Sequence, residues 1–221
     1  MNTNYSTHID SFWDKRLEDL GKVFESSGYI SYIVGDLTEA YRVVTEKIVP
    51  ELAPKRVSWG DSQTFLASGL FDFFKSGREW EFIDIEKNEE NFEENLETRR
   101  QALLTDLFLT GSNAVTEDGM LVNLDMIGNR VGGITFGPRN VVILVGRNKI
   151  VPDLDTALDR VKEYAAPVNA MRFGLNTPCA ITSRCNDCSS KERICNYWTI
   201  TERSFPAGRI RVVLINQDLG F

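Results

Sequence analysis

The chain has 221 residues, of which 42% are hydrophobic and 26% charged, and its formal net charge is −7 at pH 7. This length supports one substantial core and leaves little room for two full domains. An acidic chain has no long-range attraction for nucleic acid or for an anionic membrane, so we expect neither as a partner. The longest apolar run, Val141–Gly146, is far shorter than the roughly 18 residues that a membrane-spanning helix needs.

The first ten residues, Met1 to Asp10, are polar and lack the apolar run of a signal peptide. We therefore expect a cytoplasmic protein, in a compartment where thiols are kept reduced. We expect a single α/β domain over residues 1–221, with residues 177–206 as a cysteine-rich appendage within it.

Predicted helices and strands alternate along the chain. Apolar residues recur at three- and four-residue steps over Thr7–Ser27 and Asp153–Ala165, which predicts two amphipathic helices. Asp36 and Glu39 resemble a capping box that opens a further helix, and we expect Pro50 to end it. Short runs of β-branched and apolar residues predict strands at Tyr29–Val34, Lys55–Trp59, Leu107–Leu109, Asn140–Gly146 and Arg209–Ile215.

The strand predicted at Asn140–Gly146 is apolar throughout its middle, which suits a parallel strand buried on both faces. Asp118-Gly119 predicts the turn of a hairpin over Ala114–Asn123. Alternating strands and helices favour an α/β fold in which a mainly parallel sheet carries helices on both faces.

All four cysteines lie near the C-terminus, in the pattern Cys-x5-Cys-x2-Cys-x6-Cys. The two-residue spacing of the middle pair lets two thiolates face one ion. Four thiolates suit an iron–sulfur cluster, with 4Fe-4S as our expectation, or a tetrahedral zinc ion as the alternative. Two disulfides or four unpaired thiols would need no metal. The predicted metal ligands are Cys179, Cys185, Cys188 and Cys195.

Two polar segments are candidates for binding a ligand. At residues 60–62 a strand turns into a helix, and backbone N–H groups there can hold an anion, although a tight turn capped by Ser62 explains the pattern equally well. Residues 123–130 combine amide and guanidinium groups beside glycines, and a solvated hairpin is the alternative. The candidate ligand-binding residues are Gly60, Asp61, Ser62, Asn123, Asn129 and Arg130.

The only histidine, His8, lies at the N-terminal end of the chain. A histidine-dependent triad or a histidine-ligated metal site is therefore not expected.

Several of these segments together resemble the lactate-utilisation (LUD) domain family, in a stand-alone, cysteine-bearing branch. The resemblance covers nearly the whole chain from about Phe12. It is carried by Ser58–Ser62, Thr110–Gly119, Gly128–Val131, Phe136–Pro138, Gly146–Val151, Ala165–Ala170 and Thr177–Cys179. It implies the NagB/RpiA/CoA-transferase-like fold and a link to bacterial L-lactate oxidation, in which family members act beside iron–sulfur proteins.

Three functions follow from these observations. The first is a redox protein of lactate utilisation, which carries an iron–sulfur cluster and binds a small carboxylate or phosphate, or an iron–sulfur redox partner. Arg130 would pair with the carboxylate. The second is a zinc-stapled metabolite-binding or regulatory protein without catalysis. The third is an acyl or CoA transferase with Glu117 as its nucleophile, because Thr116–Gly119 is similar to the Ser-Glu-Asn-Gly turn of family I CoA transferases.

Overall fold

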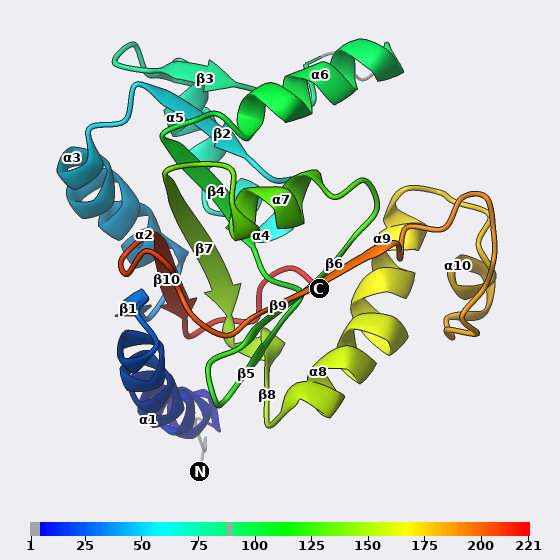
Figure 1. Cartoon of the computed structure of the whole chain (residues 1–221). Helices are drawn as coiled ribbons and strands as arrows, with labels where there is room; N and C mark the ends of the chain where they lie inside the picture. The colour runs from blue at the N-terminus through cyan, green and yellow to red at the C-terminus, as the bar shows by residue number, and fades with distance from the viewer. Residues whose placement is uncertain (1–4, 88–89) are drawn as a thin grey trace.

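A computed structural model of the chain describes residues 5–87 and 90–221, so residues 1–4 and 88–89 of the expected domain lie outside the described part. Two sheets organise the fold (Figure 1). The larger sheet has six parallel strands in the order β1 (Ile30–Val34), β10 (Ile210–Ile215), β7 (Asn140–Gly146), β4 (Leu107–Gly111), β2 (Arg56–Trp59) and β3 (Glu81–Ile83). The expected parallel α/β fold is confirmed.

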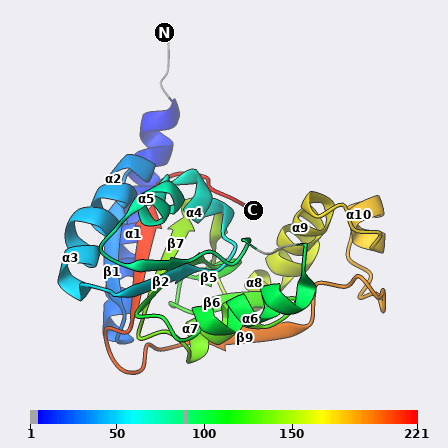
Figure 2. The same ribbon diagram turned by 90° about the horizontal axis from the view of Figure 1, so that it is seen from above.

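Helices lie around the larger sheet, with α4 and α5 on one side of β2 and α6 and α7 on the other (Figure 2). No helix within residues 5–87 and 90–221 has the length and apolar character needed to cross a membrane. The α-helices are α1 (Tyr5–Ser26), α2 (Leu37–Arg42), α3 (Val49–Leu52), α4 (Gln63–Ala67), α5 (Leu70–Ser76), α6 (Phe92–Ala102), α7 (Asn129–Thr135), α8 (Leu154–Arg160), α9 (Ala166–Arg172) and α10 (Pro178–Thr182).

The centre of the core is the pair of neighbouring strands β7 and β10. Every residue of β10 is buried, as is every residue of β7 after Asn140. Val142 lies in register between Leu109 on β4 and Arg211 on β10. Because full burial of one valine, leucine or isoleucine stabilises the fold by roughly 1.5–3 kcal/mol, these strands contribute strongly to the core. The prediction of a strand buried on both faces is confirmed.

The smaller sheet contains the predicted hairpin. Its order is β8 (Ile150–Val151), β5 (Ala114–Thr116), β6 (Leu121–Asp125) and β9 (Tyr197–Thr201). β5 and β6 pair antiparallel, and Gly119 adopts φ +88° at the turn between them. β9 follows the last cysteine and pairs antiparallel with β6. β9 is not predicted from the sequence, because its residues are largely exposed and show no clear alternation of polar and apolar side chains.

The expectation that Pro50 ends a helix is wrong, because the chain stays helical to Leu52. A π-helical segment, η1 (Val43–Ile48), joins α2 to α3. The Val49 N–H donates to the Val44 carbonyl five residues earlier, and Pro50 then lies in the first turn of α3, where an N–H has no intrahelical partner. The same device recurs where η3 (Val161–Ala165) precedes Pro167 in α9.

Gly28 follows α1 with φ +81°, and a Cβ at this position would lie 2.9 Å from the Ser204 carbonyl oxygen. We expect Gly28→Ala to cost about 1–2 kcal/mol for the left-handed backbone, and a further ~1–3 kcal/mol because backbone must move. Gly69→Ala is the matched control, since Gly69 has φ +75° and no atom within 4 Å of the added Cβ. Urea unfolding measures both variants, and equal losses would contradict the close contact at Gly28.

Candidate functional site

A pocket of about 250 Å³ lies at the carboxyl ends of the parallel strands. Ligands of open α/β sheets bind outside this edge, because the loops that follow neighbouring strands meet there. β2 leads into Gly60–Ser62, β4 leads into Ser112 and Asn113, and β7 leads through the 3-10 helix η2 (Arg147–Lys149) to Lys149. Gly220 and Phe221, beyond β10, complete this side of the pocket.

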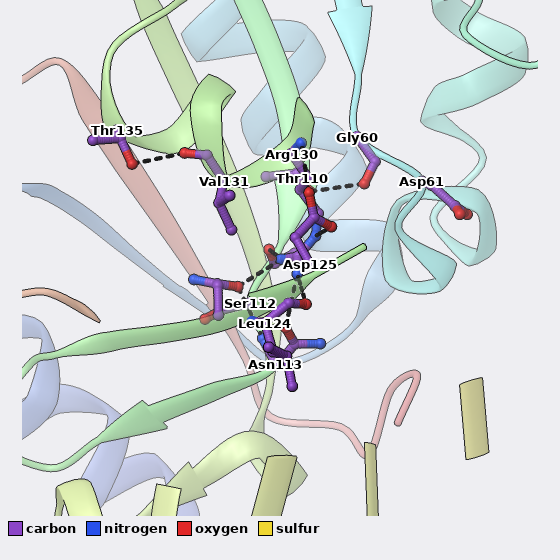
Figure 3. Close-up of polar contacts among 12 residues, drawn as sticks. Gly60, Asp61, Thr110, Ser112, Asn113, Leu124, Asp125, Arg130, Val131 and Thr135 are labelled. Atoms are coloured by element: carbon purple, nitrogen blue, oxygen red, sulfur yellow. Dashed lines mark hydrogen bonds and ion pairs between the residues drawn. The ribbon is translucent and has the colours of Figure 1, made fainter. Parts of the chain in front are cut away.

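Arg130 holds the wall of the pocket together from within (Figure 3). Its guanidinium NH1 donates to Asn123 Oδ1 at 2.6 Å, and NH2 donates to Asn113 Oδ1 at 2.7 Å and to the Leu124 carbonyl at 2.9 Å. Its Nε lies 3.6 Å from Asp125 Oδ1. These contacts hold α7 against the end of β4 and against β6. The guanidinium is therefore bonded to protein groups in the pocket wall and is not directed at a ligand.

Asn113, in the loop after β4, is bonded to Arg130, Asn123 and Leu124. Its Oδ1 also accepts from the Leu124 N–H at 2.9 Å, and its own N–H donates to Asn123 Oδ1 at 3.2 Å. Arg160 NH1 donates to the Asn113 carbonyl at 2.6 Å. Buried polar groups that are satisfied in this way specify one arrangement of the loop.

Lys149 is the most unusual group in the pocket, because its side chain is buried without an acidic partner. The residue is 5% exposed, and its ammonium nitrogen donates to Thr64 Oγ1 at 3.2 Å. Within the described residues no carboxylate lies at ion-pair distance from it. Burial, together with the neighbouring Arg160 and Arg130 charges, lowers the pKa of Lys149 to about 7.

The mouth of the pocket carries further charges. Arg172 NH2 lies 3.1 Å from Asp61 Oδ2, and Arg99 Nε donates to Asn95 Oδ1 at 2.7 Å. The charged side chains that line the pocket are the cations Arg99, Arg130, Lys149 and Arg172 and the carboxylates Asp61 and Asp125. When Lys149 is protonated, cations therefore exceed carboxylates, and the pocket favours an anion.

The structure brings most of the predicted ligand-binding residues together. The pocket lining includes Gly60, Asp61, Ser62, Asn129 and Arg130. Ser62 also caps α4, because its Oγ accepts from the Phe65 N–H at 3.3 Å. Asn123 is fully buried behind the wall, where it positions Arg130.

Glu117 lies outside this group, at the tip of the hairpin. Its carboxylate forms an ion pair with Arg16 of α1. Glu117 is not among the residues that line the pocket.

The four cysteines lie in and after α10, at the edge of the molecule away from the larger sheet (Figure 1, Figure 2). All are free thiols of intermediate exposure. Cys195 packs against the smaller core beneath the hairpin. Burial raises the pKa of the Cys195 thiol, although Lys162 and Arg193 lower it, and the Cys179 and Cys185 sulfurs are close enough to contribute.

This donor set fits a thiolate-bound metal by its chemistry, since four soft sulfur ligands share one short segment beside cationic side chains. The sulfur atoms are not drawn together around a common point. Across residues 5–87 and 90–221, no three histidine, cysteine or acidic side chains are grouped closely enough to hold an ion.

The sequence model of the LUD domain matches residues 17–215 of the chain. The protein belongs to the LUD domain family. Among solved structures, a DUF162 family protein from Deinococcus radiodurans is similar at 13% identity, with a TM-score of 0.48 over 91% of this chain and 97% of that chain. No curated protein matches the chain. The predicted resemblance to the LUD family is confirmed, and it relates the protein to lactate utilisation.

Sequence reasoning missed the two residues that dominate the interior of the pocket, Lys149 and Asn113. Each follows a buried parallel strand within three residues. That position is the available signal, because polar side chains placed directly after such strands reach the ligand edge of the sheet.

We expect Arg130→Leu to destabilise the protein by about 3–5 kcal/mol, because it leaves Asp125 and the two asparagine oxygens without their cation. Urea unfolding provides the measurement. Arg139→Leu is the control, since Arg139 pairs with Asp106 on the surface at 3.5 Å and is 84% exposed, so its loss should cause no measurable change. Similar losses in both variants would show that the Arg130 network adds nothing beyond a surface ion pair.

Proposed function

We propose that this LUD-domain protein acts in lactate utilisation by binding a small carboxylate or phosphate in the pocket, next to an iron–sulfur cluster held by its four cysteines. The observation that carries the ligand class is the buried, acid-free ammonium of Lys149. A buried charge of this kind is costly unless a counter-charge accompanies it, and an anionic ligand supplies that counter-charge.

The geometry supports Lys149, rather than Arg130, as the contact for the anion. The Arg130 donors are already bonded to Asn113, Asn123 and Leu124. Lys149 has one hydrogen-bond partner, Thr64, which leaves two of its three ammonium hydrogens for a ligand. Arg172 and Arg99 add positive charge at the mouth of the pocket.

The cysteine segment borders the pocket, which supports a linked role for the two sites. Ile194 lines the pocket, and Cys195 follows it directly. When bound, an iron–sulfur cluster would supply one-electron transfer between the protein and a redox partner. Cys179, Cys185, Cys188 and Cys195 would hold it, while Lys162 and Arg193 would offset the negative charge of their thiolates.

Anion binding depends on the Lys149 ammonium, so we expect L-lactate to bind the wild-type protein and to bind Lys149→Met at least about tenfold more weakly. Isothermal titration calorimetry measures both. Affinity should fall as the pH rises from about 6 to 9, because the pKa of Lys149, set by burial, Arg160 and Arg130, is about 7 and only the protonated amine attracts the anion.

Lys75→Met is the control, since Lys75 pairs with Asp84 and is not a lining residue of the pocket. Inorganic phosphate, titrated in parallel, separates the two ligand chemistries. Equal affinity of wild type and Lys149→Met for both ions would remove Lys149 from the site.

We expect protein purified without oxygen to contain iron and sulfide and to absorb visible light, and we expect Cys188→Ser to lose both signals. Metal analysis and an absorption spectrum provide the test. A colourless protein with stoichiometric zinc would instead make the segment a structural zinc site. A metal-free protein that folds equally well with and without Cys188 would contradict any metal at these cysteines.

A further inference from the structure

Lys149 also has the surroundings of a nucleophilic amine. Of the lysines in the described part of the chain, it alone is buried. Two glycines lie beside the amine: a Cβ added at Gly220 would lie 3.3 Å from its Nζ, and one added at Gly111 would lie 3.6 Å from it. Two side chains are therefore absent from the immediate surroundings of the amine, and it lines the pocket.

The hydroxyl groups beside the amine can assist proton transfer. Thr64 Oγ1 accepts from Lys149 Nζ at 3.2 Å, and a Cβ at Gly111 would also lie 2.8 Å from Ser62 Oγ. The Lys149 amine and the Ser62 hydroxyl thus flank the same glycine. Hydroxyl groups donate and accept, so they can carry a proton to or from a group that reacts at Nζ.

Burial and the neighbouring positive charges keep part of the Lys149 amine neutral near pH 7. Burial is the largest cause, and the guanidinium groups of Arg160 and Arg130 add repulsion, so that the pKa is about 7. Only a neutral amine attacks a carbonyl carbon, and enzymes activate lysine by desolvation or by a neighbouring cation. Both conditions are met at this position.

We propose that Lys149 forms a reversible Schiff base with the carbonyl carbon of a small 2-oxo acid, an inference that rests on the proposed anion site. The Nζ lone pair forms a bond to the carbonyl carbon, and the carbonyl oxygen takes up protons and leaves as water. One carbon–nitrogen double bond replaces the carbon–oxygen double bond. Of the two amine hydrogens, one stays on the iminium nitrogen, and the other leaves in the water together with one proton from solvent. No electrons are gained or lost in this step.

A 2-oxo acid fits because its carboxylate is attached directly to the reacting carbon. With the carbonyl carbon at Lys149, the carboxylate stays within a pocket whose charged lining is mainly cationic. The resulting iminium retains the positive charge of the protonated lysine, so the counter-charge of the carboxylate is needed before and after the reaction. A neutral ketone lacks this counter-charge, and a 2-hydroxy acid lacks the carbonyl.

The test is reductive trapping of the full chain with pyruvate and sodium cyanoborohydride, followed by intact-mass and peptide mass spectrometry. We expect about one adduct per chain, located on Lys149, and none at that position in Lys149→Arg, which keeps a positive charge but lacks the amine. L-lactate should give no adduct, and acetone should react about tenfold more slowly because it lacks the charged contact. Circular dichroism verifies that the variant is folded.

The pH dependence separates this reaction from simple anion binding. At saturating pyruvate, the rate of adduct formation should rise between about pH 6 and pH 8 as Lys149 loses its proton, whereas the affinity for L-lactate should fall over the same range. Adducts spread over exposed lysines, or pyruvate binding without an adduct on Lys149, would overturn the Schiff base and leave the anion site intact. Absence of any binding of pyruvate or L-lactate would overturn both.

Discussion

The parallel arrangement of β2, β4, β7 and β10 is the constraint on which the rest of the structure depends. Parallel strands end at the same edge of a sheet, so the segments that follow them are brought together although they lie far apart in the sequence. Thr64 and Lys149 are separated by 85 positions and share a hydrogen bond. β10, and β7 beyond Asn140, make this edge rigid, because they are buried on both faces.

A second property of the fold is the placement of guanidinium groups on backbone carbonyls. Arg209 donates to the carbonyls of Gly133, Ile134 and Pro138, at and beyond the end of α7. Arg130, in the first turn of α7, donates to the Leu124 carbonyl of β6. Carbonyls at a helix end lack intrahelical partners, and a cation there also interacts favourably with the helix dipole. The two arginines therefore fix α7 at both ends, and α7 in turn forms one wall of the pocket.

The strands and the hairpin turn could be predicted because apolar runs and Asp118-Gly119 depend on local sequence alone. The continuation of the helix through Pro50 could not be predicted. It depends on the single π-helical turn η1, which places Pro50 where no N–H is needed, and no feature of the composition marks that turn. Residues 60–62 and Arg130 could be recognised as polar groups near strand ends. Their roles could not, since only the folded chain reveals that Asn113 and Asn123 occupy the Arg130 donors and that Lys149 lacks an acid.

The widened turn η3 has a consequence for how the chain can vary in length. It holds one residue more than an α-helical turn, and the next residues, from Ala166 to Arg172, line the pocket or lead to its mouth. Deleting one residue from η3 would rotate α9 by about 100° relative to α8. Arg172 would then leave Asp61, and Pro167 would face a carbonyl it cannot satisfy. The length of η3 thus sets the rotation of α9, and with it the position of the cysteine segment relative to the pocket at the edge of the larger sheet.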